Sequence, residues 1–390
     1  MKIVAFAYSC EPGEGSEPGA GWMWSRLLGR VGETWVITRS NNKERIDRHL
    51  ASIPERDRIH FEYVDLPEWA RRWKKGTRGL RLYYPLWQLA ALSRARKLAR
   101  SHHFTIAWHL TLANVWTGTT AAFVGDSFVY GPVGGGVPGS FRSWRALGWK
   151  GVRAELARSA VRTAARYVNP LARLGWRRAR TILVQNPETR EWLPRRHRHK
   201  AVVLPHVIFD GEPVRERTPP GGAPGRALLA ARLLPWKGAA LAIEAVAALP
   251  GWTLDICGTG PDEARLRRLA DRHGVADRVT FHGWVERNVV LSLMGEASVF
   301  VLPSMHDEAG WVVVEALAGG LPVVCLARGG PPLLGGTPVP LAGHRETVAR
   351  LAEAMSGARG RAAESPPRLE DVLRKVRAAV PVLGGGDDRA

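Results

Sequence analysis

The stretch ASVFVLPSMHDEAGWVVVEALAGGLPVVC, residues 297–325, decides the fold class. The apolar run 297–304 predicts a buried strand, and 304–310 predicts a turn. Residues 311–320 predict a short apolar helix that is ended by glycine, and 321–325 predict the next strand. A strand, a helix and a second strand in this order are typical of a parallel sheet in an α/β protein.

Two carboxylates lie where packing alone would not place them. Asp307 falls in the loop between the first strand and the helix, which is where open α/β sheets hold ligands. Glu315 stands in a run of valine and alanine, and a buried carboxylate costs several kcal/mol without polar partners. The hydroxyls of a ribose and a hexose would satisfy both. The alternative is that Glu315 is an exposed position of an amphipathic helix and Asp307 an ordinary acid near its start.

The spacing of these acids resembles the signature of retaining GT-B glycosyltransferases of family 4. Here Pro303-Ser304 is followed by Asp307, by seven further residues and by Glu315, whereas the family usually has glutamate at the first position. The resemblance implies that Glu315 holds the ribose of a nucleotide-sugar donor. It also implies that Asp307 contacts hydroxyls of the transferred sugar, and that Gly310 contributes to donor binding.

Strand-like and helix-like segments alternate in two series, as expected for a GT-B architecture of two Rossmann-like domains that face one another across a cleft. A chain of 390 residues is long enough for two cores. We expect an acceptor domain over residues 1–209, a Pro- and Gly-rich linker over 210–225 and a donor domain over 226–365. Residues 366–390 predict a last helix and a frayed tail.

The segment LLAARLLPWKGAALAIEAV opens the second series and carries two cations. Arg232 follows a predicted strand, and Lys237 directly precedes a predicted helix. Two cations beside a helix N-terminus suit a diphosphate, whose charge they would neutralise when it leaves. The pair resembles the Arg and Lys of the same family, in a pattern that ends in Lys-Gly. Taken singly, each cation is equally compatible with a solvated surface position.

Glycines follow a strand in ICGTGPDEARLRRLA, where Gly258 and Gly260 let the backbone approach a ligand. This is not a dinucleotide fingerprint, because the third position is occupied by Glu263. In the family that the chain resembles, this segment and the later FHGWV frame the nucleobase. That resemblance assigns a backbone contact with the base to Val285.

The first series offers a second group of candidates. In SCEPGEGSEPGAGW, Gly19 and Gly21 predict a loop whose amides face the donor diphosphate, with an ordinary structural turn as the alternative. His109 ends a predicted strand, where the family has a histidine that touches the donor sugar. A lone histidine among apolar residues is also compatible with the core. The glycine loop 131–136 is expected near the acceptor.

The net charge of +20 is concentrated in two stretches, 71–100 and 142–180, with ten and eleven Lys or Arg residues respectively and a single acid. Both stretches also contain aromatic residues: Trp73, Tyr83, Tyr84, Trp87, Trp144, Trp149, Tyr167 and Trp176. Cations with interfacial aromatics suit an anionic membrane surface. A nucleic-acid surface and a merely solvated basic face are the alternatives. Three scattered cysteines and a short apolar N-terminus favour a reducing cytoplasm.

The resemblance implies a retaining hexosyltransferase, and the two basic stretches favour a location at the inner face of the cell membrane. Its expected partners are a nucleotide-diphosphate sugar, a saccharide or lipid-linked acceptor and an anionic membrane, with no nucleic acid. No Asp-x-Asp triplet occurs in the sequence, so we expect metal-independent catalysis without a cofactor, with Arg232 and Lys237 in the place of the metal. The alternatives are a nucleotide-sugar epimerase of the same fold and a non-enzymatic basic protein that binds nucleic acid.

Overall fold

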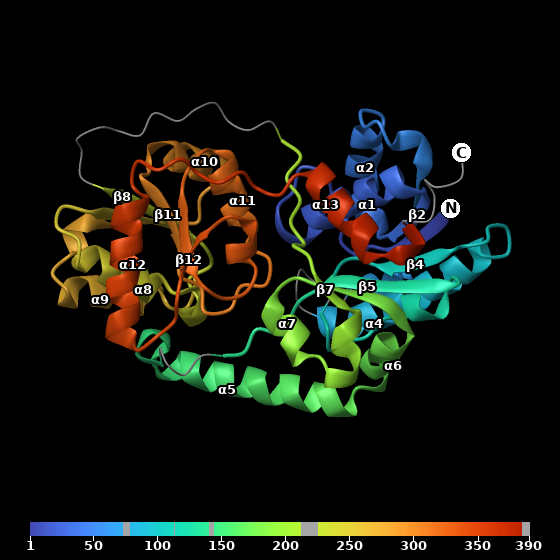
Figure 1. The fold of residues 1–390 in the computed structure, drawn as a ribbon, viewed down its shortest axis with the longest axis horizontal. Coiled ribbons are helices and arrows are strands. Elements are labelled where there is room, and N and C mark those ends of the chain that lie inside the picture. Colours follow the sequence, from blue (N-terminus) through green and yellow to red (C-terminus); the bar gives the residue numbers. More distant parts are fainter. Residues whose placement is uncertain (73–78, 113, 140–143, 212–224, 384–390) are drawn as a thin grey trace. The chain divides into compact units, whose positions relative to one another are not determined.

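The computed structural model describes residues 1–72, 79–112, 114–139, 144–211 and 225–383 (Figure 1). The chain forms two compact units. Unit 1 comprises Met1–Gly136, Ala164–Ile208 and Arg368–Ala390, and unit 2 comprises Val137–Thr163 and Phe209–Pro367.

Unit 1 is built on a seven-stranded sheet in the order β3-β2-β1-β4-β5-β6-β7, and every pair is parallel. The strands are β1 (Lys2–Phe6), β2 (Glu33–Thr38), β3 (Ile59–Tyr63), β4 (Ile106–His109), β5 (Ser127–Val133), β6 (Ala179–Val184) and β7 (Ala201–Val203). In β1 the side chains of Val4 and Phe6 enter one apolar cluster and those of Ile3 and Ala5 another. Both faces of the sheet are therefore covered, as near-continuous apolar strands require.

Helices cover the two faces of this sheet. They are α1 (Ser16–Val31), α2 (Lys43–Leu50), α3 (Glu68–Arg72), α4 (Leu80–Leu98), α6 (Pro170–Arg178), α7 (Pro187–Trp192) and α13 (Leu369–Ala379), with the end of α5 (Trp144–Val168). Apolar residues of α1 and α13 share the cluster of Ile3, whereas those of α4 and α6 share the cluster of Val4. The helix predicted near the C-terminus thus belongs to unit 1.

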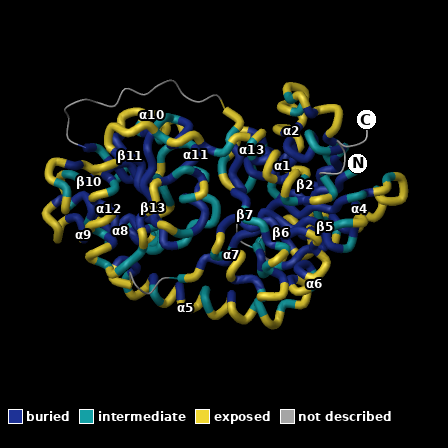
Figure 2. The backbone as a smooth tube through the Cα atoms, viewed as in Figure 1, coloured by how far each residue is buried: buried dark blue, intermediate teal, exposed yellow. Residues whose placement is uncertain are grey.

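Unit 2 contains a six-stranded parallel sheet in the order β10-β9-β8-β11-β12-β13. The strands are β8 (Arg226–Ala230), β9 (Thr253–Cys257), β10 (Val279–Gly283), β11 (Val299–Leu302), β12 (Val323–Leu326) and β13 (Thr337–Val339). The helices are α8 (Ala239–Ala247), α9 (Glu263–Arg272), α10 (Arg287–Glu296), α11 (Trp311–Ala318) and α12 (His344–Ala358). The inner strands β4, β11 and β12 are buried along their whole length, whereas the edge strands β3 and β10 are mostly half-buried (Figure 2).

The predicted strand, helix and strand of residues 297–325 are confirmed as β11, α11 and β12. One segment is placed differently from the predicted ranges, because residues 137–163 cluster with unit 2. The reason is that Ala146 and Leu147 of α5 are buried in the apolar core formed by α8, α9 and α12. Most of the predicted linker, residues 212–224, and the tail 384–390 lie outside the described residues.

The order of the strands reverses once in each sheet. In unit 1 the reversal lies between β1 and β4, and in unit 2 it lies between β8 and β11. Loops that leave the carboxyl ends of strands at such a point diverge, which makes these edges the usual ligand sites of open α/β sheets.

Candidate active site

The site in unit 2 is formed by the two loops that follow β8 and β11, residues 231–238 and 303–310. The backbone N–H of Met305 donates a hydrogen bond of 2.8 Å to the carbonyl oxygen of Trp236. Gly238 has a φ of +78°, and a Cβ atom at this position would lie 1.9 Å from the carbonyl oxygen of Pro303. Only glycine therefore allows the two loops to approach this closely.

The loops bring together two of the predicted residues. The Nζ atom of Lys237 lies 2.6 Å from Oδ2 of Asp307, and the two side chains are 21% and 15% exposed. Lys237 ends a short 3-10 turn, Pro235–Lys237, immediately before α8. The positive and the negative group thus share the carboxyl edge of the sheet where the strand order reverses.

Glu315 also has a cationic partner supplied by the protein. Its Oε1 accepts a hydrogen bond of 2.7 Å from Nε of Arg287, the first residue of α10. The carboxylate is 14% exposed and the guanidinium side chain 61% exposed. Arg287 is thus the partner of Glu315 in this structure, and the contact of Glu315 with a ribose stays a prediction. Sequence reasoning missed Arg287 because the contact depends on how α10 packs against α11.

Arg232 lies in the loop after β8 and is exposed. Among the described residues it forms no ion pair, whereas the Lys237 ammonium is already paired. Arg232 is thus the member of the predicted cation pair that is available to an anion in this structure.

The glycines after β9 serve contacts within the protein. Gly258 has a φ of +131°, and an added Cβ would lie 2.0 Å from the carbonyl oxygen of Ala231. Gly260 makes a similar approach to the carbonyl oxygen of Leu233. These glycines therefore let the loop after β9 pack on the loop after β8. Val285 lies between β10 and α10, and Gly310 directly precedes α11 as its N-cap residue.

In unit 1, Gly19 and Gly21 lie inside α1, so the prediction of a loop at these positions is wrong. Gly19 falls in the first turn, where backbone N–H groups have no partner within the helix. Gly21 falls in the second turn, and a Cβ there would lie 2.0 Å from the carbonyl oxygen of Ser9. Tertiary packing thus overrides the low helix propensity of glycine.

His109 ends β4 and is 1% exposed. Its Nδ1 lies 2.9 Å from Oγ1 of Thr119, and its Nε2 lies 3.4 Å from the hydroxyl of Tyr84. Burial lowers the pKa of His109 to about 4, against a smaller opposing effect of the Glu17 carboxylate. The ring is therefore neutral and held by the protein, and its contact with a donor sugar stays a prediction.

Glu17, near the start of α1, is a further acid that sequence reasoning missed. Its Oε2 accepts a 3.0 Å hydrogen bond from the backbone N–H of Leu112 and lies 3.8 Å from Nε2 of His206. Burial would raise the pKa of Glu17, but His206, this N–H and His109 outweigh it and lower the pKa. Its position in a glycine-rich stretch after the first strand was the available signal.

The aromatic residues of the basic stretches divide into two groups. Four of them are buried in the core, namely Tyr83, Tyr84, Trp87 and Trp176. Their predicted placement at a membrane interface is therefore wrong. Trp144, Trp149 and Tyr167 are exposed, whereas Trp73 lies outside the described residues. No helix in the described part of the chain has the length and apolar character needed to span a membrane. No cluster of three or more His, Cys, Asp or Glu suited to a metal occurs among the described residues.

Residues 213–334, which include both loops, match the family of glycosyl transferases group 1. This part of the chain is therefore similar to that family. The curated proteins that the chain resembles include 2-deoxystreptamine N-acetyl-D-glucosaminyltransferase of Streptomyces fradiae, at 34% identity over 143 residues. That match covers 36% of this chain and 32% of the relative. The lipopolysaccharide core biosynthesis glycosyltransferase LpsE of Rhizobium meliloti is 39% identical over 100 residues, which cover 26% of this chain and 29% of that protein. The chain thus spans about a third of the length of these relatives.

Solved structures support the fold over the whole chain. The lipopolysaccharide outer core galactosyltransferase WaaB aligns with a TM-score of 0.59 and 14% identity, over 98% of this chain and 96% of that one. HepE of Anabaena, solved in complex with UDP, aligns with a TM-score of 0.57 and 16% identity, over 98% and 100% respectively. The chain therefore has the GT-B fold, as predicted, with parallel sheets of seven and six strands.

Proposed function

We propose that the chain is a retaining glycosyltransferase that moves a hexose from a nucleotide-diphosphate sugar to a hydroxyl acceptor. The observation that carries this proposal is the Lys237–Asp307 pair, which puts a cation and a carboxylate at the carboxyl edge between β8 and β11. The match of residues 213–334 to the group 1 family and the names of the relatives support it. Since HepE is solved with UDP and with UDP-glucose, UDP-hexoses are the first donors to test.

Each candidate residue has a distinct proposed task. Lys237 and Arg232 neutralise the donor diphosphate, and Glu315 holds the ribose hydroxyls after exchanging Arg287 for them. Asp307 accepts hydrogen bonds from the transferred sugar. Val285, Gly310 and the glycines after β9 line the nucleotide. From unit 1, His109 and the start of α1 with Gly19 and Gly21 are proposed to contact the sugar and the diphosphate.

We propose a front-face reaction. The bond between the anomeric carbon and the diphosphate oxygen breaks, and the acceptor oxygen bonds to that carbon on the same face. The acceptor proton passes to the departing diphosphate, so that the products are a glycoside with retained configuration and a nucleoside diphosphate. The role of the protein is to orient the two substrates and to stabilise the charge on the leaving group.

The proposed acceptor is a lipid-linked saccharide, as used in polysaccharide or glycolipid synthesis, reached from the inner face of the cell membrane. Support comes from α4, where the exposed residues Leu82, Leu86 and Leu89 recur at helical spacing. The same face continues into the exposed cations Arg96 and Arg100. An apolar helical face next to cations suits the interface of an anionic membrane.

The test is product analysis with a panel of UDP-, GDP- and ADP-hexoses, with and without saccharide acceptors. A transferase yields the nucleoside diphosphate and a glycoside of unchanged anomeric configuration, with slow hydrolysis when the acceptor is omitted. Conversion of the donor sugar to its epimer without an acceptor would instead identify an epimerase. A trapped covalent glycosyl-enzyme would contradict the front-face reaction.

A further inference from the structure

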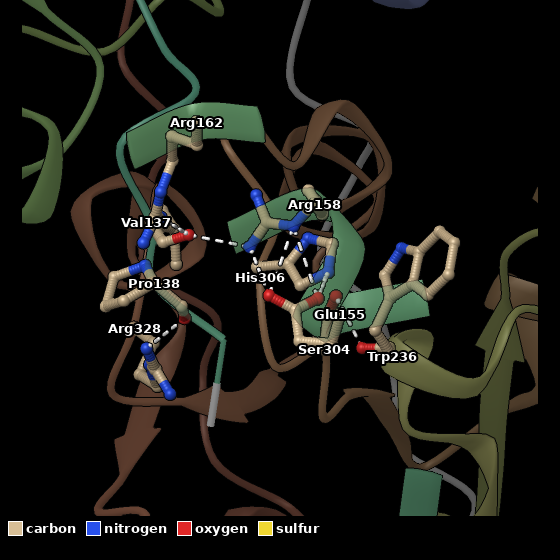
Figure 3. Close-up of polar contacts among 9 residues, drawn as sticks. All are labelled: Val137, Pro138, Glu155, Arg158, Arg162, Trp236, Ser304, His306 and Arg328. Atoms are coloured by element: carbon tan, nitrogen blue, oxygen red, sulfur yellow. Dashed lines mark hydrogen bonds and ion pairs between the residues drawn. The ribbon is translucent and has the colours of Figure 1, made fainter. Parts of the chain in front are cut away.

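A buried acid from the first half of the sequence lies inside unit 2. Residues 137–163 belong to this unit, and Glu155 of α5 is 2% exposed there. Its Oε1 accepts a 2.7 Å hydrogen bond from Nη2 of Arg158, and its Oε2 lies 3.0 Å from Nε2 of His306 (Figure 3). The latter contact is a close approach of the ring to the carboxylate rather than an aligned hydrogen bond.

His306 connects this acid to both loops of the candidate site. It directly precedes Asp307 in the loop after β11. Its ring also stacks on that of Trp236, with centroids 5.2 Å apart and an interplanar angle of 19°, and Trp236 directly precedes Lys237. His306 is thus the residue before Asp307, and it stacks on Trp236, the residue before Lys237.

The surroundings of Glu155 fix its position on unit 2. Arg158 and Arg162 both donate to the carbonyl oxygen of Val137, at 2.8 and 2.6 Å (Figure 3). Arg328, in the segment after β12, donates to the carbonyl oxygen of Pro138 at 2.6 Å. Val137 is therefore held by two arginines of α5, and Pro138 is held by the segment after β12.

The loop that carries Asp307 is also held by the segment after β12. The backbone N–H of Gly330 donates to the carbonyl oxygen of Asp307 at 2.9 Å. Gly329 approaches the same carbonyl, because an added Cβ would lie 2.0 Å from it. The backbone of Asp307 is thus fixed by the segment after β12, and the residue before it is fixed by α5.

A buried ion pair is weak evidence for a role in stability, because well-packed apolar residues often replace such a pair without loss. Burial would raise the pKa of Glu155, but His306 and Arg158 outweigh it and lower the pKa to about 2. The carboxylate is therefore ionised at neutral pH. A charge kept at this place, one residue from the proposed sugar-binding acid, indicates control of loop geometry.

We infer that Glu155 is a positioning residue, which acts through His306 to fix the loop 303–310 and thereby the direction of the Asp307 carboxylate. The inference rests on the proposed transferase function. It adds that a helix encoded before the donor-binding half of the sequence completes the donor site. Small displacements of an oriented group lower turnover strongly, by about 100-fold per ångström.

The experiment compares Glu155→Gln, His306→Gln and the double variant with wild type in the full-length chain. Glu263→Gln is the matched control, since Glu263 also pairs with an arginine of its own helix in unit 2, Arg267 at 2.8 Å. For each protein, UDP affinity is measured by calorimetry and kcat by initial rates with the best UDP-hexose. Hydrogen exchange is followed in peptides that span 303–310 and 263–272.

We expect each single variant to lose about 10- to 100-fold in kcat while its Kd for UDP stays within about 3-fold. The kcat of the double variant should be no lower than that of the less active single variant, because both changes break the same contact. Exchange should rise in 303–310 and stay unchanged in 263–272. Glu263→Gln should behave as wild type.

Unchanged kcat and unchanged exchange in Glu155→Gln overturn the inference, as do losses that multiply in the double variant. If Glu155→Gln does not fold, His306→Gln breaks the same contact from the loop, and wild-type exchange and turnover in that variant overturn the inference equally. Failure of the proposed function is recognised separately, because wild type itself would then neither bind UDP nor transfer a sugar. In that case the exchange data still decide whether Glu155 positions the loop.

Discussion

The ammonium of Lys237 lies 2.6 Å from a carboxylate oxygen of Asp307, at the edge of the unit 2 sheet where the strand order reverses. The two groups that we assign to the diphosphate and to the sugar therefore neutralise one another in the ligand-free chain. A bound donor has to offer each of them a replacement, a phosphate oxygen for the lysine and sugar hydroxyls for the aspartate. A ligand that offers only one replacement leaves the other charge without its partner, which is unfavourable in a half-buried site.

Replacing Asp307 by asparagine tests the role of the carboxylate in turnover. The amide keeps the size of the side chain but removes the charge, so that Lys237 becomes free for a phosphate. We expect kcat to fall by about 100-fold or more, while the Kd for UDP stays unchanged or tightens a few-fold. Initial rates and calorimetry measure the two quantities. A variant that retains turnover within about 3-fold of wild type would show that Asp307 has no part in the reaction.

Glu315 should control nucleotide affinity rather than turnover. Glu315→Ala removes a carboxylate that we assign to the ribose hydroxyls, and hydrogen bonds to a charged group are worth about 1.5–3 kcal/mol. The Kd for UDP should therefore rise by about 10- to 100-fold, and the thermal stabilisation by UDP should disappear. Arg287→Ala is the matched control, because it breaks the same ion pair but leaves the carboxylate in place. If both variants lose affinity for UDP equally, nucleotide binding requires the ion pair and not the carboxylate alone.

The sequence was sufficient for the elements of residues 297–325, because apolar runs of strand and helix length are separated there by Pro, Ser and Gly. It put Lys237 and Asp307 each between a strand and the helix that follows, and the structure brings the two together although they are 70 residues apart. Both follow strands that a parallel sheet sets side by side. Contacts between helices were not accessible in this way. Arg287 and Glu155 reach their partners only because of how α10 and α5 pack, which no local pattern reports.

Helix α4 shows why burial was misjudged in the basic stretches. Tyr83 and Trp87 are spaced for one face of the helix, and Leu82 and Leu86 are spaced equally well for another. Periodicity cannot tell which of two apolar faces meets the core, and the structure buries the aromatic one. The prediction of a loop at the glycines of α1 was wrong for another reason. Their low helix propensity is outweighed by tertiary contacts such as that between Gly21 and Ser9.

The burial of His109 predicts a pH dependence of stability. Its pKa is lowered from 6.5 to about 4 in the folded chain, so that below pH 6.5 the unfolded chain binds a proton that the folded chain does not. Stability should therefore fall as the pH drops from 6.5 to about 4, by up to about 3 kcal/mol in total from this group. Denaturant unfolding of wild type and of His109→Gln over this range isolates the effect, because other titrating groups are common to both. Parallel curves for the two proteins would contradict the prediction.

The exposed leucines of α4 predict binding to anionic vesicles. Flotation with phosphatidylcholine vesicles that contain phosphatidylglycerol should recover the chain, and vesicles of phosphatidylcholine alone should recover much less. Replacing Leu82, Leu86 and Leu89 by serine should abolish recovery, and high salt should weaken it through screening of the basic residues. Serine at Val289 and Leu291, which are exposed on α10, is the control. Equal recovery with both kinds of vesicle would remove the proposed membrane contact.

Gly238 lies where the two loops of the candidate site meet, so its substitution should destabilise unit 2. Gly238→Ala introduces a Cβ 1.9 Å from the carbonyl oxygen of Pro303, at a φ of +78°. Gly274 has a similar φ of +64°, but a Cβ there would meet nothing within 4 Å. Gly274→Ala should therefore cost only about 1–2 kcal/mol for the left-handed backbone, whereas Gly238→Ala adds a collision with backbone that cannot move freely. Denaturant unfolding should show the larger loss for Gly238→Ala, together with a lower affinity for UDP. Equal losses of stability in the two variants would mean that the loops separate without penalty, and that their close approach is not what holds Lys237 beside Asp307.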